Sequence, residues 1–102
     1  MYAKDLRPVR RKTQSKYPQA IADFTAAMGR GAATSLVYAN RGNAYRLAGD
    51  HRRALADLTE AIRLDPKNTT AYQLRARVHE ALNDPARARA DDQAAARLGA
   101  GK

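Results

Sequence analysis

Three aspartates recur at a constant interval and are the first candidates for chemistry. Asp23, Asp57 and Asp91 stand thirty-four residues apart, each within a similar phrase: AIADFTAAM, ALADLTEAI and ARADDQAAA. Acid–base catalysis by carboxylates needs groups that converge on one reacting centre. Acids that recur with a repeat instead occupy the same place in each repeat. We therefore expect them on the surfaces of repeated helices, and we predict no enzymatic activity.

The other residues with reactive side chains give no stronger signal. His51 falls where a helix is expected to begin and His79 falls at a packing position, so structural roles are predicted for both. The chain has no cysteine, which excludes disulfides, thiolate metal sites and a cysteine nucleophile. The glycine-rich stretch GRGAA at 29–33 lacks the strand and the Lys-Ser/Thr of a phosphate loop. No metal and no cofactor are expected.

Composition describes one small globular domain. The 102 residues are 44% hydrophobic, which is ordinary for a folded protein. No apolar stretch approaches the length of a membrane span, and the N-terminus lacks the apolar segment of a signal peptide. A soluble, cytoplasmic protein is the expectation.

The positive charge is concentrated near the N-terminus. Residues 1–16 carry six basic side chains against Asp5 alone, a net of +5 within a chain total of +9. Such a basic arm could bind nucleic acid or an anionic membrane surface by releasing counterions. Only Tyr2 could stack on bases, so the alternative of a solvated, poorly ordered tail is preferred.

The period of the aspartates extends to whole supersecondary units. Repeats of twenty to fifty residues are typical of solenoids, in which stacked units share one core. Apolar and small residues follow helical spacing, and they predict helices at about 18–28, 35–48, 51–64, 69–82 and 85–97. Gly49 is expected to end one helix, Asp50 to cap the next, and Pro66 to force a turn. Close helix contacts are expected at four small residues: Gly42, Ala54, Ala76 and Ala88.

The middle copy resembles the tetratricopeptide repeat (TPR). The segment YANRGNAYRLAGDHRRALADLTEAIRLDPKN supplies the family's aromatic, small, alanine and proline positions in register, and departs at Arg41, where the pattern has Leu. Its NRGNAY wording is similar to a variant of bacterial members. The third copy is weaker, and the first keeps only its second half, because Pro8 replaces the packing glycine and we expect no regular helix there.

The resemblance implies an all-α, right-handed solenoid of antiparallel helix pairs. It covers residues 17–98 as one leading helix and two helix pairs, with a basic arm at 1–16 and a short tail at 99–102. It also implies a non-catalytic scaffold that receives a peptide or protein segment in a concave groove lined by the first helix of each pair. The groove positions that this predicts are Leu36, Ala39, Asn40, Asn43, Arg46, Leu47, Thr70, Gln73, Leu74, Arg77, Glu80 and Ala81.

The chemistry of these positions favours a polar ligand. Asn40 and Asn43 can donate to and accept from a peptide backbone, and Arg46 and Arg77 suit carboxylates. The alternative is that these are merely solvated helix faces. A carboxylate clamp of the kind that holds chaperone C-termini is rejected, because only one of its five positions is matched in either register tried.

The two ends of the array differ. Asp92 replaces the apolar residue of earlier copies, which predicts that the C-terminal end faces water and that the array stops there. At the other end, Ile21, Phe24 and Met28 lack a first helix to cover them. They predict an apolar patch used for self-association, with a possible homodimer, or for docking of a partner.

Overall fold

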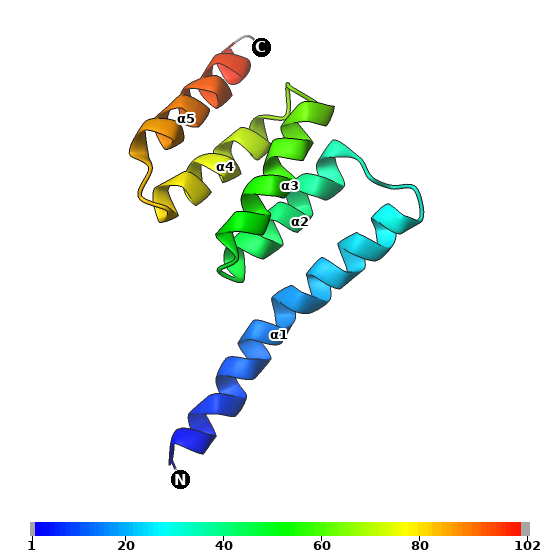
Figure 1. Ribbon diagram of the computed structural model, residues 1–102, viewed down its shortest axis with the longest axis vertical. Coiled ribbons are helices and arrows are strands. Elements are labelled where there is room, and N and C mark those ends of the chain that lie inside the picture. Colours follow the sequence, from blue (N-terminus) through cyan, green and yellow to red (C-terminus); the bar gives the residue numbers. More distant parts are fainter. Residues whose placement is uncertain (1, 101–102) are drawn as a thin grey trace.

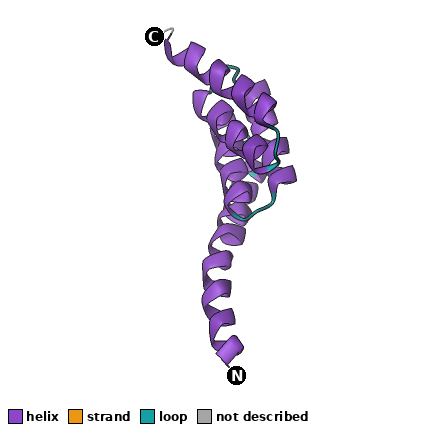
Figure 2. Cartoon of the chain, turned by 90° about the vertical axis from the view of Figure 1, so that its left-hand side faces the viewer, coloured by secondary structure: helices purple, strands orange, loops and turns teal. Residues whose placement is uncertain are grey.

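Residues 2–100 fold into five α-helices joined by short turns (Figure 1). A computed structural model describes residues 2–100, and it describes side chains for residues 16–99. The helices are α1 (Tyr2–Gly29), α2 (Ser35–Leu47), α3 (His51–Leu64), α4 (Thr69–Ala81) and α5 (Pro85–Ala100). No strand occurs in residues 2–100 (Figure 2). The predicted all-α class is confirmed.

The turns within the two helix pairs follow the expected local chemistry. Gly49 takes a positive φ of 87°, and the Asp50 side chain accepts a hydrogen bond from the Arg53 backbone N–H. One period later Asn83 has a φ of 61° and Asp84 accepts from the Arg87 N–H. Asn is among the few residues other than glycine that adopt this conformation readily. The predicted bounds of α2 to α5 are therefore correct to within three residues.

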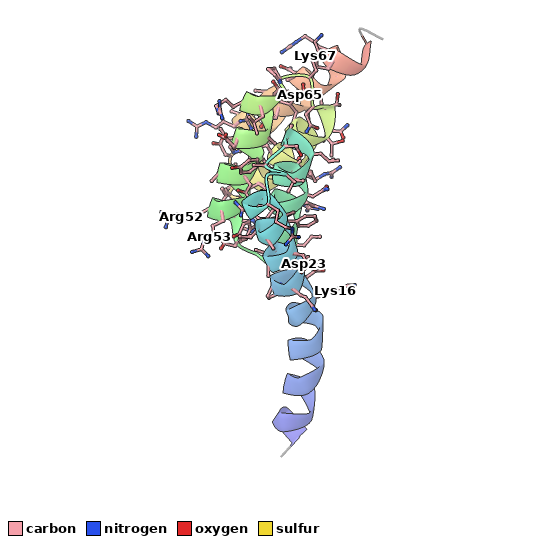
Figure 3. The ribbon with its side chains drawn as sticks, turned by 90° about the vertical axis from the view of Figure 1, so that its right-hand side faces the viewer. Lys16, Asp23, Arg52, Arg53, Asp65 and Lys67 are labelled. Carbon is pink, nitrogen blue, oxygen red and sulfur yellow. The ribbon has the colours of Figure 1, made fainter. Side chains whose placement is uncertain are left out.

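The first helix is longer than predicted. We expected it to begin at residue 18 with no regular helix before it, but α1 begins at Tyr2. Pro8 and Pro18 each remove one backbone hydrogen bond, whereas most residues between them are good helix formers, and extending an existing helix is easier than starting one. Side chains of the predicted arm up to residue 15, and residues 101–102 of the predicted tail, lie outside the described residues (Figure 3). The division into arm, repeat domain and tail stays a prediction.

The helices stack as a repeat. Helix α2 packs on α3, α4 packs on α5, and the two pairs meet where α3 contacts α4. Helix α1 packs on α2, and its N-terminal half extends beyond the other helices (Figure 1). Helix α2 also contacts α4, whereas α3 contacts neither α1 nor α5 within the described residues. The first helices of both pairs therefore share one side of a helical-repeat solenoid.

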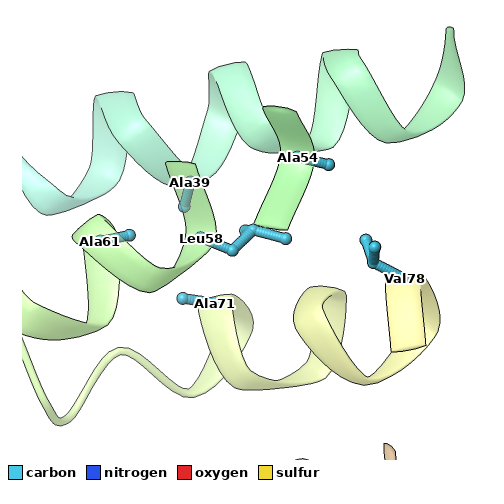
Figure 4. Packing of buried hydrophobic residues seen from close by; sticks show 6 residues of the cluster. All are labelled: Ala39, Ala54, Leu58, Ala61, Ala71 and Val78. Carbon is cyan, nitrogen blue, oxygen red and sulfur yellow. The ribbon is translucent and has the colours of Figure 1, made fainter. Parts of the chain in front are cut away.

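The core lies between α2, α3 and α4 and is built mainly from small residues. Leu58 is fully buried, surrounded by Ala39, Ala54, Ala61, Ala71 and Val78 (Figure 4). A Cβ on Gly42 would lie only 2.9 Å from Leu58 Cγ, so this residue must be glycine for the helices to approach as they do. The close contacts predicted at Gly42, Ala54, Ala76 and Ala88 are all buried, as expected.

The tight crossing of α2 and α3 predicts that Ala54→Leu destabilises the protein. Ala54 has no exposed surface, so the larger side chain must displace its neighbours, and we expect a loss of roughly 1–3 kcal/mol in the free energy of unfolding. Ala56→Leu, on the exposed side of the same helix, is the matched control and should change little. Urea unfolding followed by circular dichroism measures both. Equal stability of the two variants would contradict the assigned packing.

Candidate functional site

The predicted groove positions lie on α2 and α4, and most of them are exposed. Leu36 is 66% exposed, and Asn43 and Arg46 are half-buried. We call the accessible members the α2–α4 surface. They are Leu36, Asn40, Asn43, Arg46, Leu47, Thr70, Gln73, Arg77, Glu80 and Ala81.

Two predicted groove residues belong to the core instead. Ala39 is only 2% exposed and lies in the buried cluster around Leu58, and Leu74 is partly buried against the same cluster. The prediction treated the packing face of α2 as a single narrow stripe. Because α1, α3 and α4 all contact α2, its buried arc is wider than one stripe. Ala39 is therefore unavailable to a ligand.

Asn43 and Arg46 form a pair on the α2–α4 surface. Asn43 Oδ1 accepts hydrogen bonds from Arg46 Nε at 3.1 Å and from Arg46 Nη2 at 3.0 Å. Asn43 was expected to donate and to accept, but its acceptor oxygen is already engaged. The amide of Asn43 and the second terminal nitrogen of Arg46 can therefore offer only donors, which suits a carboxylate or a peptide carbonyl.

Of the three repeated aspartates, Asp23 is exposed as expected, but Asp57 and Asp91 are not on the helix surface. Asp57 and Asp91 are each 5% exposed, and each receives two hydrogen bonds from an arginine. Arg41 Nε and Nη2 lie 2.7 and 2.8 Å from the Asp57 carboxylate oxygens. Arg75 makes the same pair with Asp91, with both distances 2.8 Å. The surface assignment is wrong for these two, because each carboxylate is buried together with its counter-charge.

Each arginine also donates a hydrogen bond to a threonine on the preceding helix. Arg41 Nη1 donates to Thr25 Oγ1 at 3.0 Å, and Arg75 Nη1 donates to Thr59 Oγ1 at 3.4 Å. The resulting Thr–Arg–Asp networks join α1, α2 and α3, and then α3, α4 and α5. Sequence reasoning missed them because Arg41 was read only as a departure from the family pattern. The signal was present, since Arg41 and Arg75 are also thirty-four residues apart.

Tyrosine rings lie beside both guanidinium groups. The Arg41 guanidinium carbon lies 5.8 Å from the ring centre of Tyr38 and 5.7 Å from that of Tyr45. The equivalent distance from Arg75 to Tyr72 is 5.9 Å. The hydrogen bond to Asp57 raises the pKa of Arg41, and that to Asp91 raises the pKa of Arg75. Both arginines are therefore held as cations between a carboxylate and an aromatic face.

The two histidines do not form a metal site with neighbouring groups. His79 Nε2 lies 3.7 Å from Asp91 Oδ2, and His51 Nδ1 is buried without a hydrogen-bond partner in the described residues. Among the side chains of residues 16–99, no three His, Asp or Glu groups gather closely enough to hold a metal ion.

Three hollows lie away from the α2–α4 surface. One has a volume of about 400 Å³ and lies between α3, α4 and α5, lined by Leu55, Thr59, Arg75, His79, Arg87, Ala90 and Asp91. Two others lie around Asp50 and Arg52. None of the predicted groove residues lines these three hollows. An extended peptide bound on an open helix face needs no enclosed pocket.

The ends of the array are placed as follows. Asp92 is exposed, as expected for a C-terminal helix that faces water. Ile21, Phe24 and Met28 are half-buried, not fully open, because α1 packs on α2. The predicted apolar patch is therefore smaller than expected. In the described part of the chain no helix combines the length and apolar character needed to cross a membrane.

These features define an α-helical repeat protein in which the first helices of neighbouring pairs lie together. Residues 35–68, which span α2 and α3, match the family model described as tetratricopeptide repeat. The match covers 34 of the 102 residues and identifies this segment as similar to one tetratricopeptide repeat. No curated protein sequence matches the chain.

Three solved structures resemble most of the chain. The second TPR of Spaghetti (RPAP3), bound to the HSP90 peptide SRMEEVD, is 27% identical to this chain with a TM-score of 0.77. The match covers 95% of this chain and 90% of the chain in that structure. The Arabidopsis OM64 TPR domain is 27% identical with a TM-score of 0.80, covering 89% and 75%. The first TPR of Spaghetti, bound to the same peptide, is 25% identical with a TM-score of 0.79, covering 94% and 76%.

Proposed function

We propose that this protein is a non-catalytic interaction module that binds a peptide or protein segment across the α2–α4 surface. The observation that carries the proposal is the direct contact of α2 with α4, two helices that both carry exposed polar side chains. Two similar TPR structures, at 27% and 25% identity, hold a peptide, which supports the same class of ligand.

The surface favours a ligand with acceptor groups and some apolar side chains. Asn43 and Arg46 offer donors as a preset pair, and Arg77 is an exposed cation on the neighbouring helix. Leu36 and Leu47, at opposite ends of α2, are both largely exposed and can contact apolar side chains of a ligand. A segment carrying a carboxylate between apolar residues would match this arrangement.

We further propose that the ligand is not held by a carboxylate clamp. When the incomplete N-terminal copy is taken as the first repeat, Asn40 alone occupies a matching position. Thr70 and Leu74 stand where the clamp has Lys and Arg. Leu74 is also half-buried against the core. The remaining two positions, Asp5 and Val9, have side chains outside the described residues.

Removing donors from the α2–α4 surface should weaken binding without affecting the fold. Arg77→Ala and Asn43→Ala are each expected to raise the dissociation constant of a peptide selected from a library on the full chain by roughly tenfold, because each removes hydrogen bonds to an acceptor. Titration calorimetry measures the affinity, and the melting temperature should stay nearly constant. Arg97→Ala, an exposed arginine on α5, is the control. Unchanged affinity in both surface variants would exclude this surface.

The alternative function is binding of nucleic acid or an anionic surface through the basic arm. It is favoured by the continuation of α1 to Tyr2, which places the six basic residues of 1–16 on a helix that leaves the body of the protein (Figure 1). The same titrations in increasing salt separate the two functions. Phosphate binding would fall steeply and linearly with the logarithm of salt concentration, whereas peptide binding on the α2–α4 surface would fall less.

A further inference from the structure

Helix α1 carries a face that its counterparts bury. One and two periods after Ala20, Phe24 and Ala27 stand residues that are buried in α3 and α5, with Asp92 as the single exception. In α1 itself these three are half-buried and Asp23 is exposed (Figure 3). We call Ala20, Asp23, Phe24 and Ala27 the α1 docking face.

Two helix pairs of the protein show how the equivalent face is covered. Helix α2 covers it on α3 and brings Arg41 to Asp57, and α4 covers it on α5 and brings Arg75 to Asp91. On α2, Gly42 makes the approach possible, because any Cβ there would touch Leu58. The required occupant is therefore a helix with an arginine followed by a small residue.

Helix α1 already makes the same contact with the helix that follows it as α3 makes with α4. Thr25 receives Arg41 Nη1 at 3.0 Å, as Thr59 receives Arg75 one period later. Within residues 2–100, helix α1 thus acts toward α2 as α3 acts toward α4, but α2 is the only helix that contacts α1, and no helix covers α1 as α2 covers α3. No ion pair joins Asp23 to any residue within 16–99.

The chain's own N-terminal residues fit this face poorly. In the repeat register Arg7 falls at the arginine position, but Asp5 falls at the buried position of Ala39 and Pro8 at that of Gly42. A charge without a partner and a proline ring would then stand where α2 has Ala39 and Gly42, and on α2 even a Cβ at Gly42 would lie 2.9 Å from Leu58 Cγ. The same objection applies to residues 1–16 of a second copy, whose α2 and α4 already cover their own partners. Neither residues 1–16 of this chain nor those of a second copy are therefore suited to this face.

We propose that the α1 docking face binds an α-helix of another protein that carries an arginine in register with Asp23 and a small residue over Phe24. The pairing would reproduce the bidentate contact of Arg41 with Asp57, and the small residue would let the helix approach as α2 approaches α3. This site is separate from the α2–α4 surface, so the two proposals stand or fall independently.

The probe is a peptide copy of α2, the helix that covers the equivalent face of α3. A synthetic peptide of residues 34–48, acetylated and amidated, is titrated into the ¹⁵N-labelled full chain and followed by NMR. We expect shift changes concentrated in residues 17–29. Asp23→Asn in the protein, or Arg41→Gln in the peptide, should each weaken the dissociation constant about tenfold, and combining them should cost little more. Asp92→Asn, an exposed aspartate on α5, is the control and should bind like the wild type.

Several results would overturn the proposal. These are an absence of shift changes at millimolar peptide, changes centred on α3 because the peptide displaces α2, and equal binding by Asp23→Asn. Sedimentation of the wild-type chain tests the remaining occupant. A dimer that dissociates on Phe24→Asp would assign the face to a second copy and not to a different protein.

Discussion

Asp57→Ala is expected to lower the free energy of unfolding by roughly 3–5 kcal/mol, the range seen when one partner of a buried ion pair is removed. Asp57 accepts two hydrogen bonds from Arg41, and the two side chains are 7% and 18% exposed. The variant would leave a mostly buried guanidinium without its carboxylate, and Arg41 would also stop holding Thr25 in its present geometry. The loss should therefore loosen α1 as well as the α2–α3 pair.

A double-mutant cycle separates the cost of an orphaned charge from the worth of the pair. Arg41→Leu restores the residue of the family pattern but leaves Asp57 buried without a cation, so alone it should also destabilise strongly. Arg41→Leu combined with Asp57→Ala should cost clearly less than the sum, because neither charge remains buried. Arg53→Ala, which breaks the exposed pair with Asp50, is the control and should change stability by at most about 1 kcal/mol. Additive losses in the cycle would contradict the proposed coupling.

Much of the fold could be predicted because it depends on local rules repeated along the chain. The turn at Gly49 and Asp50 needs only a residue tolerant of positive φ and a capping side chain, and both can be read from the sequence. The start of α1 was mispredicted because one strong helix breaker, Pro8, was weighed above the helix formers around it. A proline sets a helix boundary only when its neighbours give the helix little support, and α1 continues through both Pro8 and Pro18.

The site was harder to predict because burial depends on neighbours that are distant in sequence. The position of Ala39 along α2 does not reveal how many sides of that helix are covered. Only the contacts of α2 with α1, α3 and α4 place Ala39 in the core. Asp57 was misplaced for a related reason. An aspartate on a helix is normally solvated, and what reverses this is Arg41 on another helix, sixteen positions earlier. Comparing the thirty-four-residue spacing of the arginines with that of the aspartates would have revealed the pairing of Arg41 with Asp57.

The position of a repeat within the array should decide how much its apolar residues contribute to stability. Each unit of a solenoid is stabilised by its own packing and by its neighbours, so an interior residue is covered from both sides and a terminal one from a single side. Leu58 is fully buried between two pairs, whereas Phe24, its equivalent one period earlier, is half-buried. The two side chains therefore provide a matched comparison within one molecule.

Leu58→Ala is accordingly expected to lower the free energy of unfolding by about 2–5 kcal/mol, enough to unfold much of a small domain. The side chain fills the space beneath Gly42 and among four alanines, and small rigid neighbours cannot collapse into the cavity. Phe24→Ala removes a larger side chain, yet it should cost only about 1–2 kcal/mol, because part of that ring is already in contact with water. Urea unfolding of both variants, monitored by circular dichroism, gives the comparison. If Phe24→Ala proved as costly as Leu58→Ala, the α1 docking face would already be covered in the free protein, and the helix proposed to bind there would have no site.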